Sequence, residues 1–187
     1  MSIDREAFFE IMASFPSGVA IVTTLDEQGA PKGLTTTAVA SVSAHPPLLL
    51  VCVDLASRTL PALQARRRFV VNFLREGRSE LALRFASKAE EKFGSLSWRP
   101  TESGLPLLVD DALAWAECET AEELETGDHV ILLGSVDAGG GPSDEDTPLL
   151  YYRRSWGVWA PVEEEESEPM PAQEVSARDL RWHGAEL

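Results

Sequence analysis

Segments with the composition of β-strands follow one another along most of this chain, and short turns join many of them. Residues 19–25 (VAIVTTL) are rich in β-branched side chains, and the sequence DEQGAP that follows is typical of a turn. Residues 33–43 are therefore expected to return as the partner strand of a hairpin. Further strands are expected at residues 48–53, 69–74, 112–123, 129–138, 149–154 and 156–159.

Helical features are confined to three segments. Residues 4–15 carry an apolar stripe at helical spacing, which is expected to dock on a larger body (Phe8, Ile11, Met12 and Phe15). Residues 57–67, with Ser57 as the predicted N-cap, and residues 78–96 are also expected to be helical. Because few helices separate the strands and hairpin links dominate, the pattern favours a closed or nearly closed antiparallel barrel over a doubly wound parallel sheet.

The length of 187 residues fits a single domain with a proper core. We expect this domain to cover residues 1–162. Residues 163–187 are rich in proline and glutamate and have little to bury, so we expect a disordered acidic tail there. Residues 139–148 (GGGPSDEDTP) are expected to form a flexible loop.

Composition excludes several classes of function. The formal net charge is -15, and the only basic cluster is residues 66–68, which argues against a nucleic-acid partner. No apolar stretch approaches the roughly 20 residues that cross a bilayer, and the first residues lack the basic region of a signal peptide. We therefore expect a cytoplasmic protein without a membrane partner.

Cysteine and histidine give little sign of covalent or metal chemistry. Cys52 and Cys118 both lie in apolar segments, and they are expected to be small buried side chains. His129 begins an apolar strand, and no histidine stands at a spacing typical of metal ligands, so no metal site is predicted. Glycine-rich phosphate loops and nucleophile elbows are missing from the sequence, so a nucleotide would have to be held by other elements.

Two segments carry groups that suit a ligand. Hydroxyl side chains are concentrated on the strand of residues 33–43, where they suit the ring of a planar heteroaromatic or a phosphate, but threonine also favours strands without any ligand. Ser57, Arg58 and Thr59 place two hydroxyls and a guanidinium in one turn. That turn suits a phosphate group, and it is equally consistent with a plain helix cap.

Taken in order, these segments resemble the flavin reductase family with the FMN-binding split-barrel fold. The matching segments include FPSGVAIVTT, KGLTTTAVASVSAHPPLLLVCVD, RFVVNFL, RFASKAEEKFGSLSW, GDHVILLGSV and LLYYRRSWG, and together they span about residues 5–160. Members of this family are the small reductase components of two-component flavin-dependent monooxygenases.

The resemblance implies a mainly β protein, an antiparallel split β-barrel with a few peripheral helices, which forms a homodimer. It implies an NAD(P)H-dependent flavin reductase, in which NADH or NADPH passes a hydride to FMN or FAD near the dimer interface. The reduced flavin would then serve a partner monooxygenase. Such chemistry needs no acid or base residue, because the cofactors supply it.

The resemblance also implies which residues form the site. His129 would lie beside the nicotinamide ring. The flavin-binding residues would be Thr35, Thr36, Thr37, Ser41, Val42, Ser43, Cys52, Val53, Asp54, Ser57, Arg58, Thr59, Phe85, Lys88 and Lys92.

Three other functions are open at this point. The first is a flavin-binding protein of the same fold that is not a reductase and uses FMN as a sensor or carrier. The second is a relative of the pyridoxamine-phosphate oxidases, which also hold FMN in a similar barrel. The third is a plain barrel that binds a small apolar ligand and no flavin.

Overall fold

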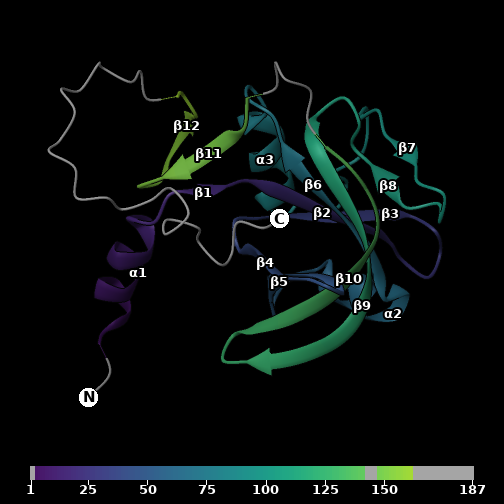
Figure 1. Cartoon of the computed structure of the whole chain (residues 1–187), viewed down its shortest axis with the longest axis horizontal. Helices are drawn as coiled ribbons and strands as arrows, with labels where there is room; N and C mark the ends of the chain where they lie inside the picture. The colour runs from purple at the N-terminus through teal and green to yellow at the C-terminus, as the bar shows by residue number, and fades with distance from the viewer. Residues whose placement is uncertain (1–2, 142–146, 162–187) are drawn as a thin grey trace, which may run out of the picture.

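The structure is a computed structural model that describes residues 3–141 and 147–161. Its main feature is a seven-stranded antiparallel sheet (Figure 1). In order across the sheet, the strands are β3 (Pro31–Thr36), β2 (Ala20–Leu25), β6 (Arg68–Leu74), β9 (Ala112–Thr126), β10 (His129–Gly140), β5 (Pro47–Asp54) and β4 (Val39–Ala44).

The ends of this strand order show that the sheet curls into a barrel. Strands β3 and β4 lie at opposite edges, yet only Thr37 and Ala38 separate them in the chain. The two edges must therefore approach each other, and the hydroxyl of Thr36 on β3 lies 3.4 Å from the carbonyl of Cys52 on β5. Residues 33–43 thus form two strands on opposite edges instead of the single returning strand expected from the sequence.

A second, smaller sheet splits away from the barrel. It consists of β1 (Ser17–Gly18), β11 (Leu149–Tyr152) and β12 (Ser155–Val158), at the upper left of Figure 1. Val19 lies between β1 and β2 and bonds to both sheets, because its N–H donates to Leu149 and its carbonyl accepts from Leu74. The prediction of an antiparallel split barrel is confirmed. Strands β7 (Arg99–Pro100) and β8 (Pro106–Leu107) form a short additional pair.

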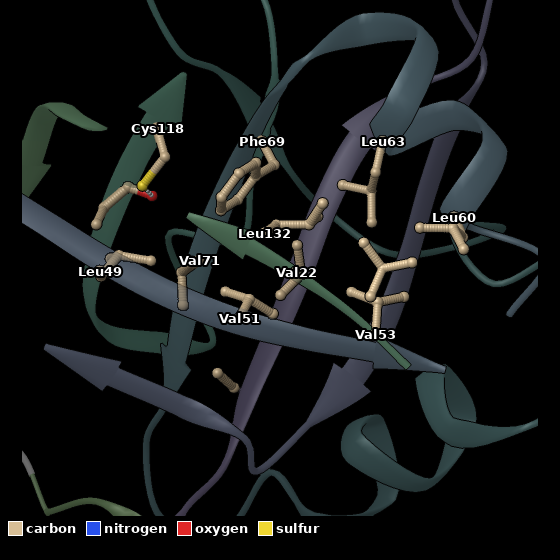
Figure 2. Packing of buried hydrophobic residues seen from close by; sticks show 13 residues of the cluster. Val22, Leu49, Val51, Val53, Leu60, Leu63, Phe69, Val71, Cys118 and Leu132 are labelled. Carbon is tan, nitrogen blue, oxygen red and sulfur yellow. Dashed lines mark hydrogen bonds between the residues drawn. The ribbon is translucent and has the colours of Figure 1, made fainter. Parts of the chain in front are cut away.

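Branched and aromatic side chains from both walls fill the barrel (Figure 2). Val22 on β2, Val51 on β5 and Phe69 on β6 are fully buried and point toward one another. Helix α2 (Leu60–Arg66) closes one end with Leu63, which is also fully buried. Each Å² of apolar surface that folding removes from water stabilises the fold by about 25 cal/mol. The buried core therefore holds rigid the strands that carry the site.

Two predicted helices are shorter than expected. Helix α2 begins at Leu60 with Thr59 as its N-cap, so the prediction that Ser57 caps it is wrong. Instead, the Ser57 hydroxyl accepts from the backbone N–H of Thr59 over 3.3 Å in the turn that follows β5. Helix α3 (Ser79–Ala86) ends far before residue 96, because Ser87 adopts an extended backbone.

Helix α1 (Arg5–Ala13) is present where the sequence predicts it, with Asp4 as its N-cap. The side chain of Asp4 accepts from the N–H of Ala7 over 2.8 Å. No residue of α1 is buried, however, so its apolar stripe does not dock on the chain's own barrel. Among the described residues, no helix is long and apolar enough to span a membrane. The predicted tail and residues 142–146 lie outside the described part of the chain.

Candidate functional site

A pocket of about 450 Å³ opens at the rim of the barrel, and we call it the rim pocket. Strand β3 and the end of β5 form one side, and the turn after β5, the end of α3 and the start of β10 complete it. The lining residues are Leu34, Thr35, Thr36, Cys52, Asp54, Ala56, Ser57, Arg58, Phe85, Ala86, Ser87, Lys88, Lys92 and His129. Segments far apart in the sequence meet here because β10 pairs with β5, which sets His129 opposite Asp54.

The threonine hydroxyls in the rim pocket are already bonded to the backbone. The hydroxyl of Thr35 donates to the carbonyl of Ala82 over 2.7 Å, which ties β3 to α3. The hydroxyl of Thr36 accepts from the N–H of Ala38 over 3.0 Å and lies 3.4 Å from the carbonyl of Cys52. Because each hydroxyl has one proton and two lone pairs, both can still accept a hydrogen bond from a ligand N–H.

Three cationic side chains gather along one side of the rim pocket. Arg58 donates from Nη1 to the carbonyl of Lys88 over 2.8 Å. Lys92 donates from Nζ to the carbonyls of Phe85 over 2.7 Å and Gly33 over 3.2 Å. Within the described residues, no carboxylate pairs with Arg58, Lys88 or Lys92. Partial burial, with the nearby charge of Arg58, lowers the pKa of Lys92 below its usual range.

This cationic side depends on the early end of α3. The chain turns at Ser87, whose hydroxyl donates to Arg84 and accepts from Ala89, and it then runs back so that Lys92 reaches Phe85. Phe85 is buried against Phe93 in an edge-to-face pair, with ring centroids 5.1 Å apart. The position of Lys92 is therefore fixed by packing as well as by its two hydrogen bonds.

His129 lies beside an acidic neighbour at the start of β10. Its Nδ1 is 2.7 Å from Oδ1 of Asp128, and this hydrogen bond lowers the pKa of Asp128. A carboxylate only accepts, so the contact places a proton on Nδ1 and leaves Nε2 of a neutral ring as an acceptor. The ring of His129 is thus oriented before any ligand binds.

Two further groups of the rim pocket, Cys52 and Asp54, are not activated for catalysis. Cys52 is half-buried, and burial raises the pKa of its thiol, so the thiolate is disfavoured. Asp54 accepts from the backbone N–H of Ala56 over 2.7 Å, which holds the turn after β5. Neither group has the partners of an activated nucleophile or a general base.

Most of the site residues expected from the sequence line the rim pocket, but six do not. Thr59 is buried, donates to the carbonyl of Gly33 over 2.9 Å and lines a neighbouring pocket. Thr37 lines a separate pocket beside α1, and the side chain of Val53 is buried in the barrel core. The remaining three lie on β4 and line none of these pockets: Ser41, Val42 and Ser43.

Sequence reasoning missed several residues of the site. Leu34, Ala56, Ala86 and Ser87 line the rim pocket, but small or apolar side chains give no chemical signal in a sequence. Asp128 could have been found, because it stands directly before His129, and a carboxylate beside a histidine commonly orients the ring.

The geometry defines a class of protein: an antiparallel split barrel with a nucleotide-sized pocket, cationic along one side, at its rim. The family model described as "Flavin reductase like domain" matches residues 12–160. The chain therefore belongs to the flavin reductase family.

Individual relatives agree with this assignment. A flavin reductase (NADH) of Kitasatospora aureofaciens is 45% identical over 164 residues, covering 87% of this chain and 85% of that protein. The flavin-dependent monooxygenase reductase subunit HsaB of Mycobacterium tuberculosis is 34% identical over 168 residues, covering 89% and 87%. Among solved structures, the Streptomyces globisporus NADH:FAD oxidoreductase SgcE6, in complex with NAD and FAD fragments, superposes with a TM-score of 0.79 at 31% identity, covering 86% of this chain and 96% of that one.

Proposed function

We propose that this protein is an NAD(P)H:flavin oxidoreductase that reduces FMN or FAD. The observation that carries the proposal is the rim pocket, which combines an oriented histidine and three cations in one space of about 450 Å³, and no carboxylate of the described residues pairs with these cations. That donor set fits a flavin nucleotide, because the cations suit a phosphate and the free lone pairs of Thr35 and Thr36 suit ring N–H groups.

The residues of the pocket bind and orient, and they do not transfer protons. When flavin and nicotinamide are both bound, they supply the chemistry, which is hydride transfer from the nicotinamide ring to the flavin ring. Arg58, Lys88 and Lys92 neutralise the flavin phosphate. Strands β3 and β5 would hold the flavin ring in one orientation. A fixed orientation raises the rate of hydride transfer, because the nicotinamide and flavin rings then face each other in the reactive geometry.

His129 is assigned to the nicotinamide. Its ring is partly exposed at the mouth of the pocket, where a second ligand can reach it after the flavin is in place. With Nδ1 held by Asp128, Nε2 accepts a hydrogen bond from the carboxamide N–H group of the nicotinamide.

Two macromolecular partners belong to the proposal. Reduced flavin passes to a separate flavin-dependent monooxygenase, by similarity to the HsaB reductase subunit. A second copy of this chain covers α1, because Phe8, Ile11 and Phe15 expose 49%, 60% and 66% of their surface, and such a stripe is unfavourable in water.

Consumption of NADH and of NADPH by the purified protein, with and without FMN, FAD or riboflavin, tests the proposal. We expect oxidation of at least one donor that depends on added or bound flavin. Protein that binds FMN but oxidises neither donor would be a flavin carrier, and oxidation of pyridoxamine phosphate would indicate the oxidase alternative. A colourless protein unaffected by FMN would contradict every flavin-based function.

A further inference from the structure

Helix α1 lies beside the small sheet of β1, β11 and β12 (Figure 1), and a cleft of about 310 Å³ separates the two. We call it the helix cleft, and it shares no lining residue with the rim pocket. The N–H of Arg153 donates to the carbonyl of Ala13 over 2.9 Å, which fixes the β11–β12 turn against the end of α1. The residues that give the helix cleft its character are Phe9, Met12, Phe15, Tyr151, Arg153 and Arg154.

The walls of the helix cleft are largely aromatic and apolar. Phe9 and Met12 contribute from α1, where 45% and 49% of their surface stays exposed, and Tyr151 contributes from β11. Tyr151 packs against Trp156 with ring centroids 4.8 Å apart, which holds its ring in place. Walls of this kind suit an aromatic ring, which gains from both apolar burial and ring contacts.

These walls use a different side of α1 from the proposed contact with a second copy. Phe8 and Ile11 carry that contact, whereas Phe9 and Met12 each lie one residue further on, which is about 100° round an α-helix. Only Phe15, beyond the end of the helix, takes part in both. Ligand binding in the helix cleft and pairing with a second copy are therefore compatible.

Two arginines give the helix cleft a positive charge. Within the described residues, neither Arg153 nor Arg154 forms an ion pair with a carboxylate, and no acidic side chain lines the cleft. Glu10 lines an adjoining pocket together with both arginines, but it pairs with neither. Guanidinium groups that lack a counter-charge suit a ligand carboxylate, which two N–H donors can bind together.

The backbone at these arginines supports a role for their side chains. Arg153 and Arg154 have φ angles of 47° and 62°, in the left-handed region where glycine is the favoured residue. Side chains held in this region commonly occur at sites that bind a ligand. Two consecutive arginines in such a turn, both lining one cleft, therefore point to a function for their guanidinium groups.

We infer that the helix cleft binds an aromatic carboxylate, with its ring against Phe9 and Tyr151 and its carboxylate on Arg153 and Arg154. The aromatic walls supply the preference for a ring, and the unpaired guanidinium groups supply the preference for a negative charge. Because the helix cleft is separate from the rim pocket, this inference does not depend on the proposed flavin reduction.

Calorimetric titration of the full-length protein with 2-naphthoate tests the inference. We expect 2-naphthoate to bind at least about ten times more tightly than 2-naphthamide, which has the same rings without the charge, and than acetate, which has the charge without a ring. Saturation with FMN should leave the 2-naphthoate affinity within about twofold. Equal affinities for 2-naphthoate and 2-naphthamide would overturn the inference, and so would displacement of 2-naphthoate by FMN.

The variant Arg154→Gly removes one guanidinium group from a position whose φ angle suits glycine, so we expect it to fold. It should weaken 2-naphthoate binding about tenfold and change 2-naphthamide binding by less than about twofold. Arg99→Ala is the control, because Arg99 is exposed on β7 and lines neither the helix cleft nor the rim pocket.

Arg154→Gly protein that binds 2-naphthoate as tightly as Arg99→Ala protein would overturn the inference. NADH and NADPH oxidation with FMN should be the same in both variants, since neither residue lines the rim pocket. Loss of 2-naphthoate binding in a protein that still reduces flavin, or the reverse, therefore separates this inference from the proposed function.

Discussion

Within the described residues, backbone carbonyls and no carboxylates hold Arg58 and Lys92 in place. The ammonium group of Lys92 donates to two backbone carbonyls. Partial burial and the nearby charge of Arg58 nevertheless disfavour its protonated form and lower its pKa. In the proposed complex, a flavin phosphate supplies the counter-charge that the described residues do not provide, and this contributes to the binding free energy.

We expect the advantage of FMN over riboflavin to shrink as the pH rises. The phosphate favours the charged form of Lys92, whose pKa is lowered, so above that pKa the affinity for FMN falls. The ratio of the riboflavin to the FMN dissociation constant, measured from neutral pH to about pH 10, checks this. Riboflavin has the same ring as FMN but no phosphate, so the ratio of the two dissociation constants cancels the titration of the ring itself. In the Lys92→Gln variant, this ratio should vary less with pH.

Replacement of His129 tests its assignment to the nicotinamide. We expect His129→Ala to raise the KM for the nicotinamide nucleotide about tenfold, with the flavin dissociation constant within about twofold, because a lost hydrogen bond to an imidazole costs about 1 kcal/mol or more. Asp128→Asn should raise the same KM by a smaller factor, since it only loosens the ring. An unchanged KM in His129→Ala would remove His129 from this role.

At the scale of elements, the close approach of β3 to α3 positions the cationic side of the pocket. A Cβ at Gly33 would lie 2.7 Å from the ring of Phe85, so only glycine allows this contact without displacement. The carbonyl of Gly33 also accepts from Lys92 and Thr59, so β3 carries both the packing and the hydrogen bonds.

We expect Gly33→Ala to lower the free energy of unfolding by about 1–3 kcal/mol, because the buried ring of Phe85 must move. Urea unfolding measures the change. Gly18→Ala is the control, since a Cβ at Gly18 would meet no atom within 4 Å. A Gly33→Ala protein as stable as Gly18→Ala would contradict the packing seen here.

The turn that joins β11 to β12 holds two arginines in a strained backbone conformation, which a glycine would relieve. Arg153 and Arg154 have φ angles of 47° and 62°, in the left-handed region that favours glycine. We expect Arg154→Gly to raise the free energy of unfolding by about 0.5–1 kcal/mol, because the strain relieved exceeds the added flexibility of the unfolded chain. Arg154→Ala removes the same charge but keeps the strain, so a gain in that variant would point to charge repulsion instead.

At the scale of the whole molecule, α1 carries an apolar stripe that the described residues of the chain leave unburied. We expect light scattering to give twice the mass of one chain. Ile11→Asp should shift the protein toward monomer, because it places a charge in the proposed interface. Leu83→Asp is the matched control, since Leu83 is comparably exposed on α3, at 56% against 60% for Ile11. A monomeric mass for the unaltered protein would contradict the proposed dimer.

The sequence by itself determined most of the strands, because their β-branched runs and turn residues are local signals; the split of residues 33–43 into β3 and β4 was not predicted. Arg58 was indicated by the chemistry of its own turn, whereas Lys88, Lys92 and His129 were indicated by the resemblance to the flavin reductases. The resemblance to the flavin reductases followed from the same segments. Helix ends were less predictable, because residues 87–96 keep a helical pattern while Ser87 turns the chain so that Lys92 reaches Phe85.

Only the tertiary structure decided which of these groups share a pocket. The hydroxyl run divides at Thr37 because the barrel closes there, so Thr35 and Thr36 face the rim pocket while Ser41 and Ser43 lie on the strand at the opposite edge. The apolar and small residues that line the rim pocket come from segments far apart in the sequence, so only the folded chain brings them together. Such long-range contacts are set by the packing of the complete barrel, and no local stretch of sequence encodes them.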